Sequence, residues 1–294
     1  MMLRRLGGWA LLLLVLIVAT GAGYVWFESQ TRIERPWPID AAGLAIPADP
    51  AALERGEHLA VTRGCTFCHA ADLGGQILTD DGFMGRVVAG NLTTGPGSAL
   101  LRYDDARLVR AIRHGVGSND RSLVVMPSES YHALSDADVG ALIAYLRSVP
   151  PVERALPATR VGPGARMLIA LNKAPLLTAE IVDHEAVRAP EPPEAVTAEY
   201  GAYVASMCVG CHGPDYSGGL VHGPPGTPPS IDLRPGGPLS GWDEEQFLMA
   251  LRHGRRPDGS IMDPSVMPWP AFTTLTDTEA RAIWAFLKTL PASP

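Results

Sequence analysis

Apolar side chains recur at helical spacing in several stretches of this chain, most clearly near the end of each half. The spacing predicts helices over Asp136 to Ser148 and Asp277 to Thr289, because steps of three and four residues gather side chains on one helix face. Ser135 and Thr276 stand at N-cap positions, and Glu279 completes a capping box with Thr276. Each stretch is therefore predicted to be the closing helix of a folded unit.

Four further helices are predicted from the same kind of pattern, in two matched pairs. One pair opens the two units and the other lies in their middle: Pro50 to Val61, Thr197 to Met207, Asp104 to His114 and Asp243 to His253. The order of helices is the same in both halves, which predicts an all-α fold built from a repeated unit.

Short motifs repeat together with the helices. Arg-His-Gly, Met-Pro and Leu-Ser/Thr-Asp each occur once per half, at offsets of 139 to 141 residues: Arg113 and Arg252, Met126 and Met267, Leu134 and Leu275. A tandem duplication explains the constant offset. We expect an anchor at 1–28, a linker at 29–49, domains at 50–150 and 196–294, and a Pro-rich linker at 151–195 between them.

The chain begins with an uncharged apolar run from Leu6 to Phe27, preceded by Arg4 and Arg5. A helix of this length can cross roughly 30 Å of hydrocarbon, and basic residues before it hold the N-terminus in the cytoplasm. A cleaved signal peptide with Leu11 to Val18 as its apolar core is the alternative. We favour a single-pass anchor in the inner (cytoplasmic) membrane. Both interpretations place the two domains on the periplasmic side.

All four cysteines belong to two copies of one pentapeptide, Cys65-Thr66-Phe67-Cys68-His69 and Cys208-Val209-Gly210-Cys211-His212. Cys-x-x-Cys-His is the attachment signal of c-type haem, in which two thiols bond the vinyl groups and the histidine binds iron. A disulfide framework has no need of the histidine. A thioredoxin-like site expects a strand before a helix, and a zinc ribbon needs its cysteine pairs close in sequence.

The motifs therefore predict two covalently bound haem c groups. Cys65, Cys68, Cys208 and Cys211 would attach them, and His69 and His212 would be axial ligands. The formal net charge of −7 argues against nucleic acid as a partner.

A haem motif, a Met-Pro pair about 55 residues later and a terminal helix occur in the order that resembles the class I cytochrome c fold. The resemblance implies two tandem class I domains, with Met126 and Met267 as the second axial ligands. Met84 and Met262 are the competing candidates. Imidazole and thioether ligation raises the potential and leaves no open site on the iron, so no catalytic residue is expected.

The remaining histidines are expected to have other roles. His114 and His253 end helices, where a cationic cap or a contact to a haem propionate is favoured over iron ligation. Four histidines without a counterpart in the other half are expected to be surface or structural residues: His58, His132, His184 and His222.

Asn91-Leu92-Thr93, followed by the helix ending at Gly115 and by Met126-Pro127, is similar to the cytochrome subunits of membrane-bound periplasmic dehydrogenases. That resemblance implies a respiratory electron carrier, which passes single electrons between a dehydrogenase or respiratory donor and a downstream acceptor, alone or within a membrane complex. The alternative is a dihaem peroxidase or thiosulfate-oxidising enzyme with one open haem, and gas sensing is a third hypothesis. The Met-Pro pair in each half argues against an open haem.

Overall fold

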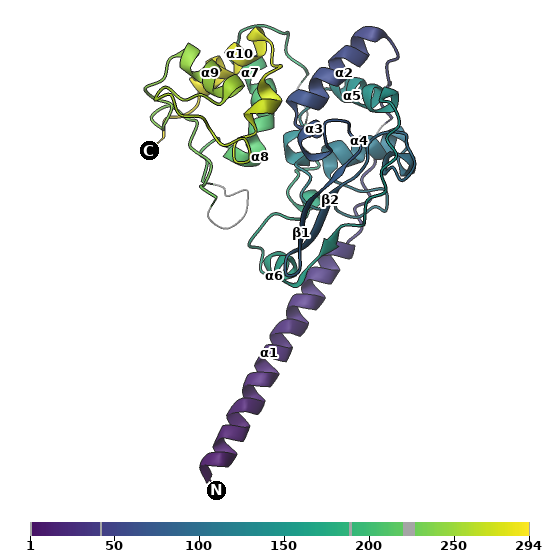
Figure 1. The fold of residues 1–294 in the computed structure, drawn as a ribbon, viewed down its shortest axis with the longest axis vertical. Coiled ribbons are helices and arrows are strands. Elements are labelled where there is room, and N and C mark those ends of the chain that lie inside the picture. The colour runs from purple at the N-terminus through teal and green to yellow at the C-terminus, as the bar shows by residue number, and fades with distance from the viewer. Residues whose placement is uncertain (1, 42, 188–189, 220–226, 294) are drawn as a thin grey trace.

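The computed structural model describes residues 2–41, 43–187, 190–219 and 227–293, with side chains from Leu6 onward. The side chains of Arg4 and Arg5, and His222, therefore lie outside the described residues. One long helix, α1 (Met2–Glu34), projects from two helical domains (Figure 1). From Leu6 on it is long and apolar enough to span a membrane, and its most apolar window is entirely unburied. A signal sequence would have the same properties.

Each domain is built from a helix before the cysteines, a short attachment helix, a central helix and a closing helix. In the first domain these are α2 (Pro50–Thr62), α3 (Cys65–Cys68), α4 (Asp105–His114) and α5 (Asp136–Ser148). In the second they are α7 (Ala198–Ala205), α8 (Val209–His212), α9 (Glu244–His253) and α10 (Asp277–Leu287). Short 3₁₀ turns connect them: η1 (Leu100–Arg102), η2 (Ser128–Ser130), η4 (Ser206–Cys208) and η5 (Trp269–Phe272).

The closing helices begin where the sequence predicts. Ser135 accepts the backbone N–H of Asp138 at 3.0 Å, and Thr276 and Glu279 form the predicted capping box. The central helices have acidic N-caps, and both end in a glycine of left-handed conformation, Gly115 and Gly254. Local sequence therefore sets these helix ends before any tertiary contact is made.

The all-α expectation is only partly right, because the first domain also contains a small antiparallel sheet of order β1-β2-β3. Its strands are β1 (Gln76–Asp81), β2 (Gly85–Ala89) and β3 (Arg160–Val161). Asp81 accepts the N–H of Phe83 at 2.8 Å in the turn that joins β1 to β2. Asp81-Gly82 between two β-branched runs is a hairpin pattern, so the sequence did contain this signal.

Within the described residues, the Pro-rich segment 151–195 packs against the first domain. It supplies β3, which pairs with β2, then α6 (Pro163–Ala170) and η3 (Thr178–Glu180). The apolar run from Met167 to Leu171 lies at the end of α6, a helix that packs against α1. The segment therefore belongs structurally to the first domain and connects it to α1.

In both domains the opening helix crosses the closing helix at a glycine. A Cβ on Gly201 of α7 would lie 1.9 Å from the carbonyl oxygen of Ala282 in α10, and one on Gly56 of α2 would lie 2.2 Å from that of Ala141 in α5. These backbones touch directly, so no side chain larger than hydrogen fits between them.

We expect Gly201→Ala to destabilise the second domain by about 1–3 kcal/mol, the usual cost of overpacking, despite the better helix propensity of alanine. Chemical denaturation of the haem-loaded protein measures this. Gly241→Ala is the matched control, because a Cβ there meets nothing within 4 Å. Equal stability of the two variants would contradict the proposed close contact.

Candidate haem sites and the interface between them

The histidine of each attachment motif is oriented by a backbone carbonyl. His69 Nδ1 lies 2.6 Å from the carbonyl oxygen of Gly90, and His212 Nδ1 lies 2.8 Å from that of Ile231. A carbonyl can only accept, so each Nδ1 must carry the proton. Nε2 then keeps its lone pair, the form in which a histidine binds a metal. The donor set therefore fits c-type haem in both domains.

Each acceptor carbonyl is followed by the same tight turn. Asn91 Oδ1 accepts the N–H of Thr93 at 2.8 Å, and Asp232 Oδ1 accepts the N–H of Arg234 at 2.9 Å. The Asn91 amide also donates to the carbonyl of Val152 at 2.7 Å. Asn-Leu-Thr has no sequence match in the second half, yet Asp-Leu-Arg forms its structural counterpart. The motif thus holds the peptide that orients the histidine.

The electrostatics of Asp232 reflect this second turn. The side-chain hydrogen bond from Arg234 lowers the pKa of the carboxyl group well below its usual range. Asp232 is therefore ionised at neutral pH and keeps its backbone bond.

The cysteines are not disposed for thiol redox chemistry. Burial raises the pKa of the Cys65 and Cys208 thiols to about 12. A reactive cysteine needs a depressed pKa, because the thiolate is the nucleophile. This environment disfavours the thioredoxin-like interpretation of the motif.

The candidate methionines lie in different surroundings. Met126 packs against the same hydrophobic core as Cys65, and Met267 packs against the core that contains Cys208. Met84 lies in the turn between β1 and β2, and its sulfur faces Gly164 of α6. This turn is at the end of the hairpin remote from Gln76, whose amide contacts Phe67 of the first motif.

The loop before each Met-Pro pair is supported differently. Thr178, buried in η3, donates to the carbonyl of Met126 at 2.7 Å, and its side chain covers Gly115 at the end of α4. In the second domain Trp269 covers Gly254 instead and donates to the carbonyl of Met262 at 3.1 Å. The first loop therefore depends on a segment outside its own repeat, and the second is supported from within.

The repeated Arg-His-Gly motif has a shared part and a divergent part in the two domains. Arg113 donates to the carbonyl of Leu134 at 2.7 Å, and Arg252 donates to that of Leu275 at 2.7 Å. Each arginine thus ties a central helix to the start of the closing helix. The histidines differ, since His114 is buried and His253 is exposed.

The histidines without counterparts that the structure describes make structural contacts. His114 Nδ1 lies 3.1 Å from His184 Nδ1, and the rings of His114 and His132 meet edge to face at 5.2 Å. His58 lies 2.9 Å from Glu279 of the other domain.

The second attachment motif lies against the first domain. The N–H of Gly210 donates to Ser130 Oγ at 3.2 Å. Ser130 lies in the short turn η2 that follows the Met126-Pro127 pair. A Cβ on Gly210 would lie 3.6 Å from the Cβ of Pro127. Burial raises the pKa of the Cys68 thiol and the nearby Cys211 raises it further, as expected for neighbouring groups. The second attachment motif therefore lies at the domain interface, against the residues that follow the first Met-Pro pair.

The interface contacts are arranged crosswise between repeated segments. α8 lies against η2, which follows the first Met-Pro pair, and α2 lies against η5, which follows the second. In each domain the turn after the Met-Pro pair therefore contacts a helix of the other domain that lies at or just before the attachment cysteines.

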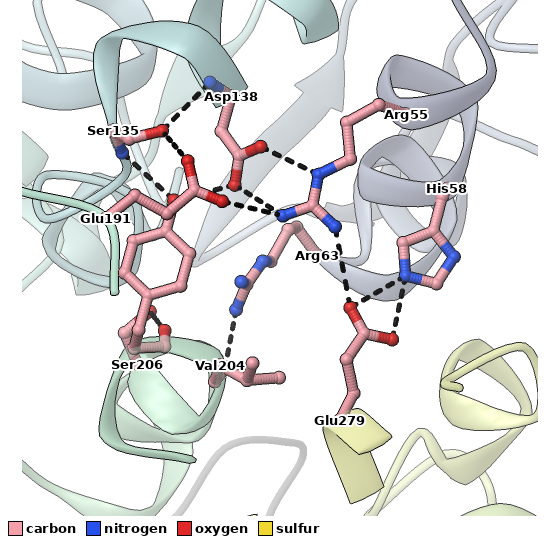
Figure 2. A network of polar contacts seen from close by, with 10 residues as sticks. Arg55, His58, Arg63, Ser135, Asp138, Glu191, Val204, Ser206 and Glu279 are labelled. Atoms are coloured by element: carbon pink, nitrogen blue, oxygen red, sulfur yellow. Dashed lines mark hydrogen bonds and ion pairs between the residues drawn. The ribbon is translucent and has the colours of Figure 1, made fainter. Parts of the chain in front are cut away.

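A cluster of polar side chains joins the two domains at this interface (Figure 2). Arg55 of α2 donates to both oxygens of Asp138 at 2.8 and 2.9 Å, and its third nitrogen lies 3.7 Å from Glu279. Asp138 and Glu279 occupy the same position of the two closing helices, and both are 2% exposed. One guanidinium therefore neutralises two equivalent buried carboxylates from different domains.

Two further side chains connect the domains around this cluster. The hydroxyl of Tyr203 in α7 donates to Asp138 at 2.6 Å and accepts the N–H of Ser135 at 3.0 Å. The buried Arg63 donates to the carbonyl of Val204 at 2.5 Å. The two domains thus share hydrogen bonds at the polar centre of their interface, as a fixed domain contact requires.

Comparison with known proteins agrees with this construction. The cytochrome c family model matches residues 53–150 and 198–291. The chain belongs to the cytochrome c family. With two such domains, this cytochrome carries two covalently bound haem c groups.

Relatives of this cytochrome include one dihaem protein of similar length. The diheme cytochrome c-type of Cereibacter sphaeroides is 29% identical over 95% of this chain and 97% of its own. A nicotinate dehydrogenase subunit of Pseudomonas putida is 27% identical over 88% of this chain. The cytochrome c subunit of the quinone alcohol dehydrogenase of Gluconobacter oxydans is 26% identical over 86%. This cytochrome spans only 23% and 58% of those two dehydrogenase subunits.

Sequence reasoning did not identify Arg55, Asp138 and Glu279 as an interface cluster, nor Gly90 and Ile231 as carbonyl acceptors. The sequence signal for the interface cluster was an acid at the third position of both closing helices, Asp138 and Glu279. Carbonyl acceptors leave no signal in residue identity, because every residue has one.

We expect Arg55→Met to loosen the interface, because two buried carboxylates lose their shared counter-charge. Breaking a buried pair costs about 3–5 kcal/mol, and the 27% exposure of this side chain places the expected loss at the lower end. Hydrogen–deuterium exchange of peptides covering residues 198–212 should accelerate. Arg107→Met removes an exposed pair within one domain and is the control. Unchanged exchange in Arg55→Met would show that the cluster does not hold the domains together.

The same cluster predicts a pH dependence. Burial raises the pKa of Glu279. The hydrogen bonds from His58 and Thr276 and the charge of Arg55 together lower it by more, so the net pKa lies below the ordinary 4.5. A depressed pKa means that the stabilisation is present above pH 4.5 and is lost as the pH falls through the folded-state value. The unfolding temperatures of the wild type and Glu279→Gln should therefore differ near neutral pH and converge below pH 4.5. A constant difference would contradict this assignment.

Proposed function

We propose that this cytochrome is a membrane-anchored dihaem relay, which passes single electrons between a dehydrogenase or respiratory donor and a downstream acceptor. The observation that carries the proposal is the hydrogen-bonded contact of the second attachment motif, through Gly210, with Ser130 in the segment that follows the first Met-Pro pair. A relay benefits from such a contact, because it keeps two redox sites adjacent without a search by diffusion. Independent catalysis is not part of this proposal.

We propose His69 and Met126 as the axial ligands of the first haem, and His212 and Met267 as those of the second. The shared cores of each methionine with an attachment cysteine support this choice. The position of Met84 beside α6 disfavours it as a ligand. Bound haem supplies reversible one-electron chemistry, whose potential the axial ligands set.

The protein's own residues have three tasks in this proposal. The carbonyls of Gly90 and Ile231 hold the histidines in the ligating tautomer. Met126 and Met267, on the two methionine loops, would bind the haem irons and so exclude small molecules from them. The Arg55 cluster fixes the relative position of the two domains.

We further propose that α1 is retained as a single-pass anchor in the inner membrane, with the domains in the periplasm. Its length and hydropathy support this, as does the packing of its C-terminal turns on α6. A cleaved signal would have no reason to pack so specifically against the mature domain. The dehydrogenase subunits among the relatives support a dehydrogenase of a membrane complex as the redox partner.

The first experiment is carbon monoxide binding to the purified, dithionite-reduced protein, followed by its visible spectrum. A relay with two six-coordinate haems should show no spectral change. Binding at either haem would overturn the ligand assignment and favour the alternative, a dihaem peroxidase or thiosulfate-oxidising enzyme with an open haem.

We expect Met267→Ala to open one haem only. Loss of the thioether should lower one of the two midpoint potentials, leave the other nearly unchanged, and allow carbon monoxide to bind at one equivalent. Potentiometric titration with carbon monoxide spectra measures both effects. Met262→Ala is the matched control and should behave as the wild type. If Met262→Ala opens a haem and Met267→Ala does not, the assignment in the second domain is wrong.

We expect Thr178→Val to make the first methionine loop more labile, because the hydrogen bond to the Met126 carbonyl is lost while the shape of the side chain is kept. Ferric Thr178→Val should therefore bind added imidazole at one haem at lower concentration than the wild type. Thr79→Val, on the exposed strand β1, is the control. If Thr178→Val and the wild type gave the same imidazole titration, Thr178 would not stabilise the Met126 loop.

A further inference from the structure

The helix α6 carries an apolar stripe that no described part of the chain covers. Pro163, Met167 and Leu171 are spaced four residues apart and share one helix face, and all three are exposed. Met167 is 43% and Leu171 is 49% exposed, whereas Ile169 on the opposite face is 1% exposed. The buried face explains why the helix forms, but the exposed stripe has no partner within the described part of the chain.

The position of α6 along α1 is fixed by two arginines. Arg166 stacks over the ring of Trp26 at 4.1 Å and donates to Ser29 Oγ at 3.0 Å. Arg32 of α1 reaches across to the carbonyl of Ile169 and to Glu180. The helix α6 therefore lies beside α1 at the level of Trp26 to Arg32.

That level coincides with the end of the apolar run. The run from Leu6 to Phe27 has a helical length of about 33 Å, close to the thickness of the hydrocarbon layer. Trp26 would then lie among the outer headgroups, where tryptophan is enriched. Figure 1 shows α6 at the lower edge of the first domain, beside the upper part of α1.

The hairpin turn adds a second apolar element at the same place. Phe83 is 59% and Met84 is 39% exposed, and the N–H of Gly164 in α6 donates to the carbonyl of Phe83 at 2.9 Å. The acidic residues of the hairpin are already engaged, because Asp81 accepts two turn N–H groups and Asp80 pairs with Arg86 at 2.9 Å. Lys173, exposed after α6, suits anionic headgroups.

We propose that this face, formed by Phe83, Met84, Pro163, Met167 and Leu171, rests in the outer headgroup layer of the membrane. It is continuous with the exit of α1 from the lipid, which is why lipid rather than a protein is the occupant that the structure favours. Together with α1 it would give the first domain a fixed orientation on the membrane instead of a flexible tether. The inference rests on the proposed retention of α1 as an anchor.

The test uses the full haem-loaded chain in nanodiscs of phosphatidylcholine and phosphatidylglycerol, with one protein per disc. Met167→Cys and Phe83→Cys are reacted with a charged, water-soluble maleimide and with a lipophilic maleimide. We expect labelling by the charged reagent to be several-fold slower than at Ile261→Cys, and labelling by the lipophilic reagent to be faster. Ile261 is the matched control, because it is 59% exposed and lies in the second domain.

The other outcomes separate the possible failures. Rates equal to those at Ile261→Cys would show a solvent-exposed face and overturn the inference. Slow labelling by both reagents would indicate a protein cover and would also overturn it. Leu16→Cys tests the anchor itself, because in a retained anchor it reacts with the lipophilic reagent alone. Reaction of Leu16→Cys with the charged reagent would contradict the anchor, independently of the result at Met167.

Discussion

A single guanidinium between two equivalent carboxylates is the interaction on which the arrangement of the domains depends. Duplication placed an acid at the third position of both closing helices, and domain packing buried both. Two buried carboxylates would repel one another and lose their hydration, and Arg55 between them offsets much of that cost. Arg55 comes from the first domain alone, since it precedes Gly56 whereas Tyr200 precedes the equivalent Gly201. The two repeats therefore differ at the position that supplies the positive charge of the interface.

The two repeats keep the geometry around the haem histidines while changing the residues that supply it. Asn91 and Asp232 form the same turn with different chemistry, because an amide oxygen and a carboxylate oxygen accept the same backbone N–H. Thr178 and Trp269 cover equivalent glycines from unrelated parts of the chain. In the first domain this contact comes from Thr178, in the segment that follows the domain. That segment is therefore packed against the domain and is not a free linker.

The segment 151–195 also connects the domains to the N-terminal helix α1. One stretch of chain pairs with β2, packs α6 on α1, and supports the Met126 loop through Thr178. The proposed anchor and the proposed first haem site are thus mechanically linked through this one segment. In the proposed relay, this linkage gives the first domain a defined height above the membrane, and the Arg55 cluster passes that constraint to the second domain.

The haem motifs, the duplication, the six helices, the N-caps of the two closing helices and the apolar N-terminal helix could all be predicted from the sequence. These features are local, since spacing, capping and attachment chemistry operate within a few residues. The small sheet was present as an Asp-Gly hairpin pattern, but its third strand comes from the distant segment after the closing helix. Three features follow from tertiary packing: which carbonyls orient His69 and His212, which acids share Arg55, and the contact of the second attachment motif with the segment after Met126-Pro127. Those outcomes depend on backbone groups common to all residues and on contacts between distant segments, so no local pattern encodes them.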